Sequence, residues 1–230
     1  MPDIIVATSI VKDGSMYNRF NPKDAAVIEN RTNFLNKQGI DIARTTLLGV
    51  DAAQRDKTLH ETNWCQYVEL TDDDLGFGMF GGPAVPNDAI ITRSPNHALA
   101  LGVADCIGTV IYDPTHRVLM LSHLGRQSLE QNGAIRSIEY LVQHHQSKPD
   151  ELKVWMTPAA GKDVYPIWAL GNRGMKEVAL EQLAEAGIDP VNITDNAVDT
   201  DKDPNYFSYT NFYNGRSEVD GDHMIVAMMS

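Results

Sequence analysis

The sequence predicts a mixed α/β (α+β) sandwich. Short apolar runs typical of strands are intermixed with amphipathic helices, and they do not follow the regular βαβ alternation of a doubly wound sheet. Most of the runs are bounded by Gly, Pro, Asn or Asp, as expected of strands separated by turns. The chain has no internal repeat or linker. At 230 residues it lies in the range where one domain, residues 1–230, is more common than two.

Three segments have the spacing of apolar residues that predicts an α-helix. In residues 22–38, apolar side chains recur near helical spacing after Pro-Lys-Asp, and Gly39 is placed to end the helix. Residues 133–147 carry an apolar stripe along one face. Residues 176–188 form the third predicted helix, which ends at Gly187.

The other apolar runs are predicted strands, because they are short and lie between turn residues. Residues 71–88 contain too many Gly, Pro and Asp residues for regular structure and are expected to form a long loop. The last run of the chain is apolar enough for a strand in the core. In chain order the predicted strands are residues 41–50, 63–70, 89–94, 97–106, 108–113, 117–124, 151–158 and 223–229.

Charge and composition restrict the class of partner. A formal net charge of −12 leaves no basic surface for a phosphodiester backbone, so we expect small-molecule partners and no nucleic acid. The chain has no cationic leader and no run of eighteen apolar residues, which predicts a cytoplasmic protein without a membrane contact. Its two cysteines, Cys65 and Cys106, are expected to be reduced thiols.

One cysteine and one histidine lie at the ends of neighbouring predicted strands. Cys106 follows the run LALGVAD, and His123 follows RVLMLS and precedes Leu-Gly-Arg. Thiolate and imidazole bind zinc and other borderline metals when a third ligand converges with them, and His60, His97 and His223 are candidates near strand starts. No CxxC or HxxxH spacing is present. The residues alone therefore favour a buried thiol beside a core histidine.

Several short motifs occur in the order found in one known family. They are MYNRFNPKDAAVIENR, NDAIITRSPNHALALGVADC, YDPTHRVLMLSHLG, TPAAGKDVY and FSYTNFYNGR. In these motifs the chain resembles the YfiH-type family, also called the multicopper polyphenol oxidase or laccase-domain family, as a divergent member. The resemblance implies a mixed-sheet, layered α-β-β-α sandwich that holds one metal ion. The expected metal is Zn²⁺, with copper less favoured.

The resemblance also implies the ligands of that metal. Two of the family's three ligands map onto Cys106 and His123. His60 is the candidate for the third, although the family's flanking Gln and Gly are absent, and another alignment places Asp51 there. A Cys-His-His site with an open position suits zinc, which activates water or polarises phosphate. Multicopper oxidation needs several copper centres, which seven scattered histidines do not supply.

The activity implied by the resemblance is that of a zinc-dependent purine nucleoside enzyme, by phosphorolysis or by deamination of adenosine- or inosine-type nucleosides. Asn18 and Arg31 match family positions and would orient an anionic substrate such as phosphate, although Arg31 as an exposed helix cation is the alternative. Asp105 would act as a base or would orient its neighbours. Tyr165 and Arg216 also match family positions, with a structural role as the alternative for both.

Three departures from the family pattern surround the inferred pocket. The Trp-Arg pair that follows the family's ligating histidine is replaced by Arg126–Gln127. Residues 162–164 replace a segment that normally runs into cysteine, and Thr210–Asn211 replaces a double arginine. These departures keep two alternatives open. One is a metal- or ligand-binding homologue with diminished catalysis, and the other is an amide hydrolase acting on peptidoglycan precursors.

Overall fold

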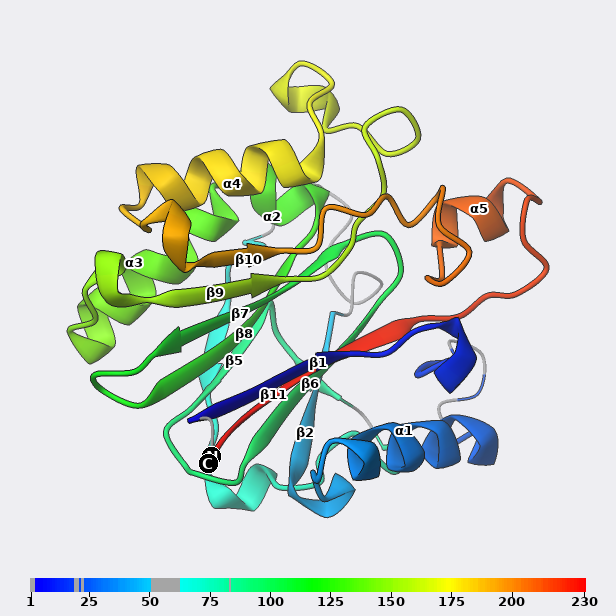
Figure 1. Ribbon diagram of the computed structural model, residues 1–230, viewed down its shortest axis with the longest axis horizontal. Helices are drawn as coiled ribbons and strands as arrows, with labels where there is room; N and C mark the ends of the chain where they lie inside the picture. The colour runs from blue at the N-terminus through cyan, green and yellow to red at the C-terminus, as the bar shows by residue number, and fades with distance from the viewer. Residues whose placement is uncertain (1–2, 19–20, 22, 51–62, 83) are drawn as a thin grey trace.

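Two β-sheets face each other, and helices cover the outer face of each sheet (Figure 1). The computed structural model describes residues 3–18, 21, 23–50, 63–82 and 84–230. One core layer lies between the sheets, and two more lie between each sheet and its helices. The predicted layered α-β-β-α sandwich is therefore confirmed.

The first sheet has the strand order β1-β11-β6-β2-β4. β11 pairs antiparallel with β1 and with β6, whereas β2 runs parallel to β6 and to β4. The first and last described strands of the chain therefore lie side by side. The strands of this sheet are β1 (Ile4–Thr8), β2 (Thr45–Gly49), β4 (Val85–Pro86), β6 (Ala98–Val103) and β11 (His223–Met229).

The second sheet has the order β10-β9-β7-β8-β5-β3. Its centre is antiparallel, because β7 pairs with β8 and β9, and β8 pairs with β5. β10 and β3 join the two edges in parallel. The strands are β3 (Tyr67–Glu69), β5 (Ala89–Thr92), β7 (Ile107–Asp113), β8 (Val118–Leu124), β9 (Lys153–Met156) and β10 (Ile193–Asp195).

Helix α1 packs on the first sheet, and α2, α3 and α4 pack on the second. The helices are α1 (Ala25–Lys37), α2 (Arg126–Glu130), α3 (Gly133–His145), α4 (Met175–Glu185) and α5 (Tyr209–Tyr213). The side chain of Asp24 accepts a hydrogen bond from the N–H of Ala26 at the start of α1, and Gly39 follows the helix with φ +73°. The three predicted helices are confirmed within a few residues.

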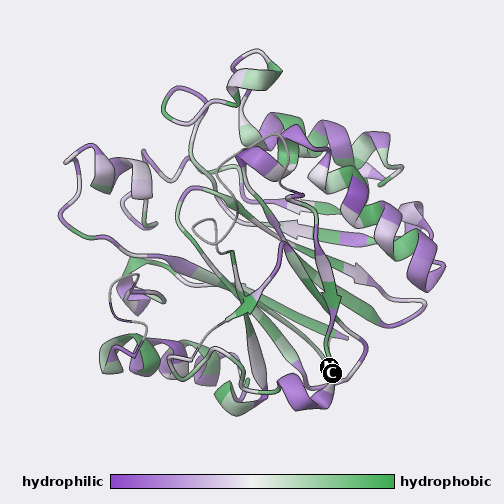
Figure 2. Cartoon of the chain, turned by 180° about the vertical axis from the view of Figure 1, so that it is seen from behind, coloured by the Kyte–Doolittle hydropathy of each residue, from purple (hydrophilic) through white to green (hydrophobic). Residues whose placement is uncertain are grey.

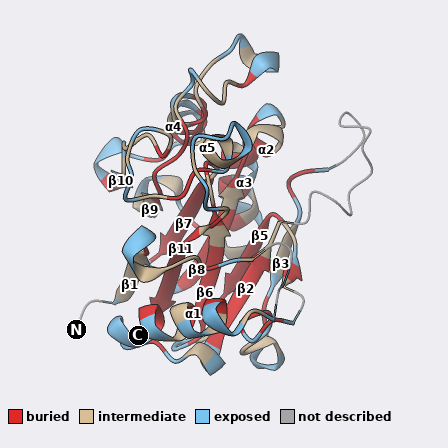
Figure 3. Cartoon of the chain, turned by 90° about the vertical axis from the view of Figure 1, so that its right-hand side faces the viewer, coloured by how far each residue is buried: buried red, intermediate tan, exposed pale blue. Residues whose placement is uncertain are grey.

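The strands alternate between two apolar layers. In β11, Ile225 and Ala227 face the second sheet, whereas Met224 and Val226 face α1. Both faces are covered, so the strand is apolar from Met224 to Met229, and in Figure 2 hydrophobic colour predominates on most of the strands. Figure 3 shows that buried residues concentrate on the two sheets and exposed residues on the outer helices and loops.

The predicted loop at residues 71–88 consists mostly of turns, with a short 3-10 helix at Asp72–Asp74 and the two-residue strand β4. It packs Met79, which is fully buried, into the layer beneath α1. Gly78 makes this approach with φ +76°, and a Cβ there would lie 2.9 Å from Cα of Ala84.

Candidate functional site

Cys106 and His123 lie at the same end of the sandwich, on the face of the second sheet that is turned toward the first. His123 in β8 is paired with Gly108 in β7, and Cys106 immediately precedes β7. His123 continues the row formed by Leu119 and Leu121, which belong to the core between the sheets. Cys106 packs against the same core. The two side chains therefore face the same space.

Gly125 provides that space. A Cβ at this position would lie 2.7 Å from Cε1 and 3.2 Å from Nε2 of His123, and 3.3 Å from Sγ of Cys106. The thiol and the imidazole thus converge on a volume that any side chain larger than hydrogen would occupy. The structure brings these two predicted ligands together.

Asp105 shapes the turn that carries Cys106. Its φ is +85°, a conformation that aspartate tolerates better than most residues. Its Oδ1 accepts a hydrogen bond from the hydroxyl of Thr200 at 2.7 Å, and its Oδ2 accepts one from the N–H of Thr210 at 2.6 Å. Both carboxylate oxygens therefore hold neighbouring segments, which supports the orienting role. The role of a base stays a prediction.

Burial and nearby carboxylates disfavour the Cys106 thiolate. Burial, together with the charges of Asp105 and Asp222, raises the pKa of Cys106 to about 12, although the charge of Arg126 opposes the rise. The negative charge of the Cys106 thiolate is the largest of the causes that raise the pKa of Tyr165, so this tyrosine lies near Cys106. Its role at the site stays a prediction. A cation bound at Cys106 would favour the thiolate.

A fully buried imidazole, that of His223, lies at the same end of the sandwich as the partly buried imidazole of His123. His223 is opposite Val103 in the β11–β6 pair, and its side chain is fully buried. Among the described residues, neither ring nitrogen has a hydrogen-bond partner, and the ring of Tyr206 is T-shaped against it at 5.4 Å. Burial lowers the pKa of His223 to about 4, although the charge of Asp105 opposes this. The imidazole is therefore neutral at pH 7.

The structure places Arg31 in the layer between α1 and the first sheet, whereas Cys106 packs against the core between the two sheets. Its Nε donates to the carbonyl of Met16 at 2.8 Å, and its Nη1 donates to the carbonyls of Gly78 and Met79 at 3.1 Å. Met16 and Met79 belong to the layer between α1 and the first sheet, on the outer face of that sheet. The alternative of an exposed cation is wrong, because Arg31 is buried and three main-chain carbonyls compensate its desolvation.

Asn18 belongs to the turn that leads into α1. Its Nδ2 donates to Asp24 at 2.8 Å, and its Oδ1 accepts from the N–H of Asn21 at 3.0 Å. Arg216 is exposed beyond α5. The proposed third ligand, His60, and its alternative, Asp51, lie outside the described residues.

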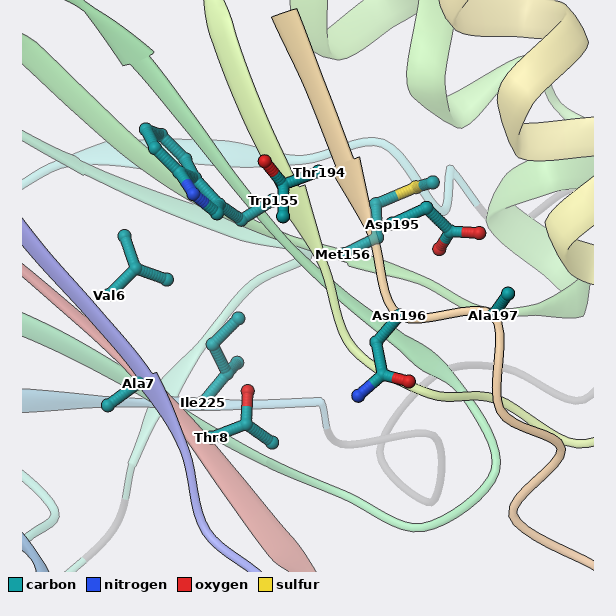
Figure 4. A pocket seen from close by; sticks show the side chains of 10 residues that line it. All are labelled: Val6, Ala7, Thr8, Trp155, Met156, Thr194, Asp195, Asn196, Ala197 and Ile225. Atoms are coloured by element: carbon teal, nitrogen blue, oxygen red, sulfur yellow. The ribbon is translucent and has the colours of Figure 1, made fainter.

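A cavity of about 380 Å³ lies elsewhere, between the edge strands β1 and β10 (Figure 4). Its walls come from β1, β9, β10, β11 and the residues after β10, with Trp155, Thr194 and Asn196 among the lining side chains. The lining contains no histidine or cysteine. This cavity therefore lacks the donors that the predicted metal chemistry requires.

The family model of the multi-copper polyphenol oxidoreductase laccases matches residues 15–176. This chain belongs to that family. The predicted resemblance is confirmed, and a laccase-type domain accounts for the motifs around Cys106 and His123. A search of curated proteins found no match.

Solved structures share the laccase-family fold across nearly the whole chain. The hypothetical protein YfiH of Bacillus licheniformis has a TM-score of 0.79 and 18% identity, covering 99% of this chain and 93% of its own. YlmD from Geobacillus stearothermophilus has a TM-score of 0.78 and 17% identity, covering 99% and 92%. NMB0706 of Neisseria meningitidis has a TM-score of 0.67 and 14% identity, covering 100% and 96%. At these identities the likeness establishes the fold.

The donors described in this laccase-family chain could serve one metal ion and do not form a multicopper centre. Cys106 and His123 supply a thiol and an imidazole beside the space at Gly125. In the described part of the chain, no three His, Cys, Asp or Glu side chains come together as a metal site. His97 bonds to Thr46 and His116 to Asp113 on separate elements, so they do not provide paired histidines.

None of the helices in the described ranges has the length and apolar character needed to cross a bilayer.

Proposed function

We propose that this chain is a zinc-dependent enzyme that acts on purine nucleosides, with Cys106 and His123 among the zinc ligands. The observation that carries the proposal is the convergence of the thiol and the imidazole on the space at Gly125. When bound in a site with an open position, zinc activates water or polarises an oxygen of the substrate.

The surrounding residues would position these two donors. Asp105 holds the turn before Cys106 through Thr200 and Thr210, which keeps the thiol directed into the space between the sheets. The pairing of β7 with β8 fixes His123 on the same face. Rigid strands position ligands more accurately than mobile loops do, so this arrangement is suited to a defined coordination geometry.

Two reactions on nucleosides fit such a site. In phosphorolysis, a phosphate oxygen attacks C1′ of the ribose, the glycosidic bond breaks, and the purine leaves with the bond's electron pair and a proton. In deamination, water adds to C6 of the adenine ring and ammonia leaves. Both need an oxygen nucleophile held beside an electropositive centre, which is the chemistry zinc supplies.

Metal content and product analysis test this proposal. We expect the purified protein to hold about one zinc ion per chain and to release free base from inosine with phosphate, or ammonia from adenosine without it. His123→Ala should lower zinc content and turnover together, by roughly a hundredfold for turnover. His116→Ala is the matched control, because it removes a histidine that bonds to Asp113 near the β7–β8 turn, at the far end of these strands.

Two outcomes would count against a zinc nucleoside enzyme. Less than about a tenth of an equivalent of zinc, unchanged by Cys106→Ala, would show that the pair holds no resident metal. Zinc without turnover of any nucleoside would favour a binding homologue with diminished catalysis, which the departure at Arg126–Gln127 already keeps open. A screen of peptidyl and acyl substrates would detect the amide hydrolase alternative.

A further inference from the structure

Arg126 begins α2 directly after Gly125, and its guanidinium is held over two aromatic rings. Its Cζ lies 5.1 Å from the ring centroid of Tyr165 and 4.4 Å from that of Trp168. Both rings come from the segment between β9 and α4, far from Arg126 in the sequence. At such distances a cation interacts favourably with aromatic faces, and a planar guanidinium also stacks on them.

Stacking leaves the N–H groups at the edge of the guanidinium available. A guanidinium has five N–H donors. In the described ranges, no ion pair and no hydrogen bond to another residue is formed by the Arg126 side chain. Other arginines differ in this respect. Arg31 donates to three carbonyls, and Arg173 pairs with Glu177 and Glu181.

The location of Arg126 is also informative. The residue before it, Gly125, is the one whose Cβ would touch both His123 and Cys106. The charge of Arg126 acts on both Cys106 and Tyr165, so the guanidinium, the phenol and the thiol are electrostatic neighbours. In a chain with a net charge of −12, a guanidinium without a carboxylate partner at this place is suited to an anionic ligand.

We propose that Arg126, held in place by Tyr165 and Trp168, is the receptor for a phosphate dianion beside Cys106 and His123. A guanidinium binds phosphate oxygens through two parallel N–H···O bonds, which gives both charge complementarity and a defined orientation. The side chain of Trp168 is 65% exposed, and its contact with Arg126 gives this exposed ring a role. The inference deepens the proposed function, because it favours phosphorolysis over deamination.

Direct binding of inorganic phosphate to the purified protein tests the receptor. We expect calorimetric titration to show that Arg126→Met weakens phosphate binding by about tenfold or more, and that Arg126→Lys lies between it and the wild type, because lysine keeps the charge without the planar fork. Arg93→Met is the matched control. Arg93 is exposed just beyond β5, at the opposite end of that strand pair from His123, and its loss changes the net charge equally.

A second variant guards against a misfolded protein. Trp168→Leu keeps the guanidinium but removes one of its two stacking surfaces, so it should weaken phosphate binding by less than Arg126→Met does. Thermal unfolding of each variant gives the folded fraction. Equal phosphate affinity in wild type and Arg126→Met, or no phosphate binding by the wild type at millimolar concentration, would overturn the inference.

A parallel titration with inosine 5′-monophosphate identifies the source of the phosphate group. If both ligands bind in competition and both depend on Arg126, free phosphate is the ligand. If only the nucleotide depends on Arg126, the guanidinium binds the phosphate group of a nucleotide and not free phosphate, which overturns the inference. If neither does, the receptor is excluded.

The inference and the proposed function can fail separately. Nucleoside cleavage that is lost in His123→Ala, together with phosphate binding that ignores Arg126, would leave the proposed function and remove the receptor. Phosphate binding that depends on Arg126, in a protein that cleaves no nucleoside, would leave the receptor and remove the proposed function.

Discussion

His223 is an unusual buried side chain, because its imidazole is fully enclosed and has no hydrogen-bond partner among the described residues. A buried donor without a partner costs about 1–3 kcal/mol, so an apolar ring would be expected at such a place in a purely structural core. The histidine lies close enough to Asp105 for the two charges to interact. Through His223, the stability of the folded protein therefore depends on pH.

We predict that His223 makes the folded state less stable as the pH falls. The unfolded chain takes up a proton near its ordinary pKa of 6.5, whereas burial holds the pKa of His223 in the folded protein at about 4. Between these values the unfolded state binds more protons, so stability is lost on acidification, by about 3 kcal/mol at most. Urea unfolding of wild type and His223→Phe from pH 7 to pH 4 measures this loss.

In that comparison His223→Phe should be within about 1 kcal/mol of the wild type at pH 7, because the substitution also removes the polar atoms that lack partners. Below pH 6.5 the difference should move steadily in favour of the variant. Parallel pH curves for the two proteins would show that this imidazole does not titrate as its burial requires.

A separate prediction concerns the effect of a side chain at Gly125 on zinc binding. Its φ is −94°, which alanine adopts without strain, so Gly125→Ala should fold. The added methyl would meet His123 Cε1 at 2.7 Å and Cys106 Sγ at 3.3 Å, and it should weaken zinc binding by about tenfold or more. Titration with a chromogenic chelator measures this. Gly82→Ala is the control, because a Cβ there meets no atom of the described residues within 4 Å.

Among the connections between elements, the β6–β7 turn is the one that matters most for the site. Asp105 joins this turn to the segment around Thr200 and to the start of α5 at Thr210. Its backbone carbonyl also accepts from the N–H of Ala160, after β9. Three segments far apart in the sequence are thus tied to the residue before Cys106.

Removal of the Asp105 carboxylate should destabilise the protein measurably. Asp105→Ala loses two charge-assisted hydrogen bonds and places alanine at φ +85°, and we expect a loss of about 3 kcal/mol in the free energy of unfolding. Asp105→Asn should cost less, because asparagine keeps one acceptor oxygen and tolerates this φ. Denaturant unfolding ranks the two. An alanine variant as stable as the wild type would contradict the anchoring role.

The layered architecture as a whole depends on polar groups that join elements within a layer as well as on apolar packing. Arg31 on α1 binds the carbonyls of Met16, Gly78 and Met79, and so connects three segments over the first sheet. On the other side, Gln182 of α4 donates to the carbonyl of Leu129 and accepts from the N–H of Ala134. Each of these side chains satisfies main-chain groups that are buried between layers.

Arg31→Met should destabilise the protein by about 3 kcal/mol, because it leaves three carbonyls without their donors. Lys37 lies on the same helix as Arg31 and forms an exposed ion pair with Asp13. Lys37→Met removes that pair and should cost less than about 1 kcal/mol. Urea unfolding compares them. If KM of the folded Arg31→Met protein rose about tenfold, the arginine would instead have the substrate role that its motif predicts.

Particular elements show how far sequence patterns reach. The helices α1, α3 and α4 were predicted because each is long enough to display an apolar stripe. The helices α2 and α5 were not predicted, because five residues do not complete a periodic pattern. The strand β1 was also missed, since its apolar run is short and only partly buried.

At the candidate site too, some features follow from the sequence and others depend on packing. The motifs indicate Cys106 and His123, and short apolar runs between turn residues predict the strand ends that carry them. Arg31 was assigned to the substrate by its motif, although its burial beneath α1 depends on how that helix packs. The stacking of Arg126 on Tyr165 and Trp168 had no signal in the sequence, because the rings and the cation come from different segments.

Local order along this chain, namely where strands and long helices run, follows from residue patterns, because backbone geometry repeats every two or 3.6 residues. The motifs also indicate which thiol and which imidazole matter. The convergence of these groups at Gly125, and the face of the sheet that each residue occupies, depends on pairing between strands and packing between layers. Such contacts join residues far apart in the chain, so they exist only once the two sheets have come together.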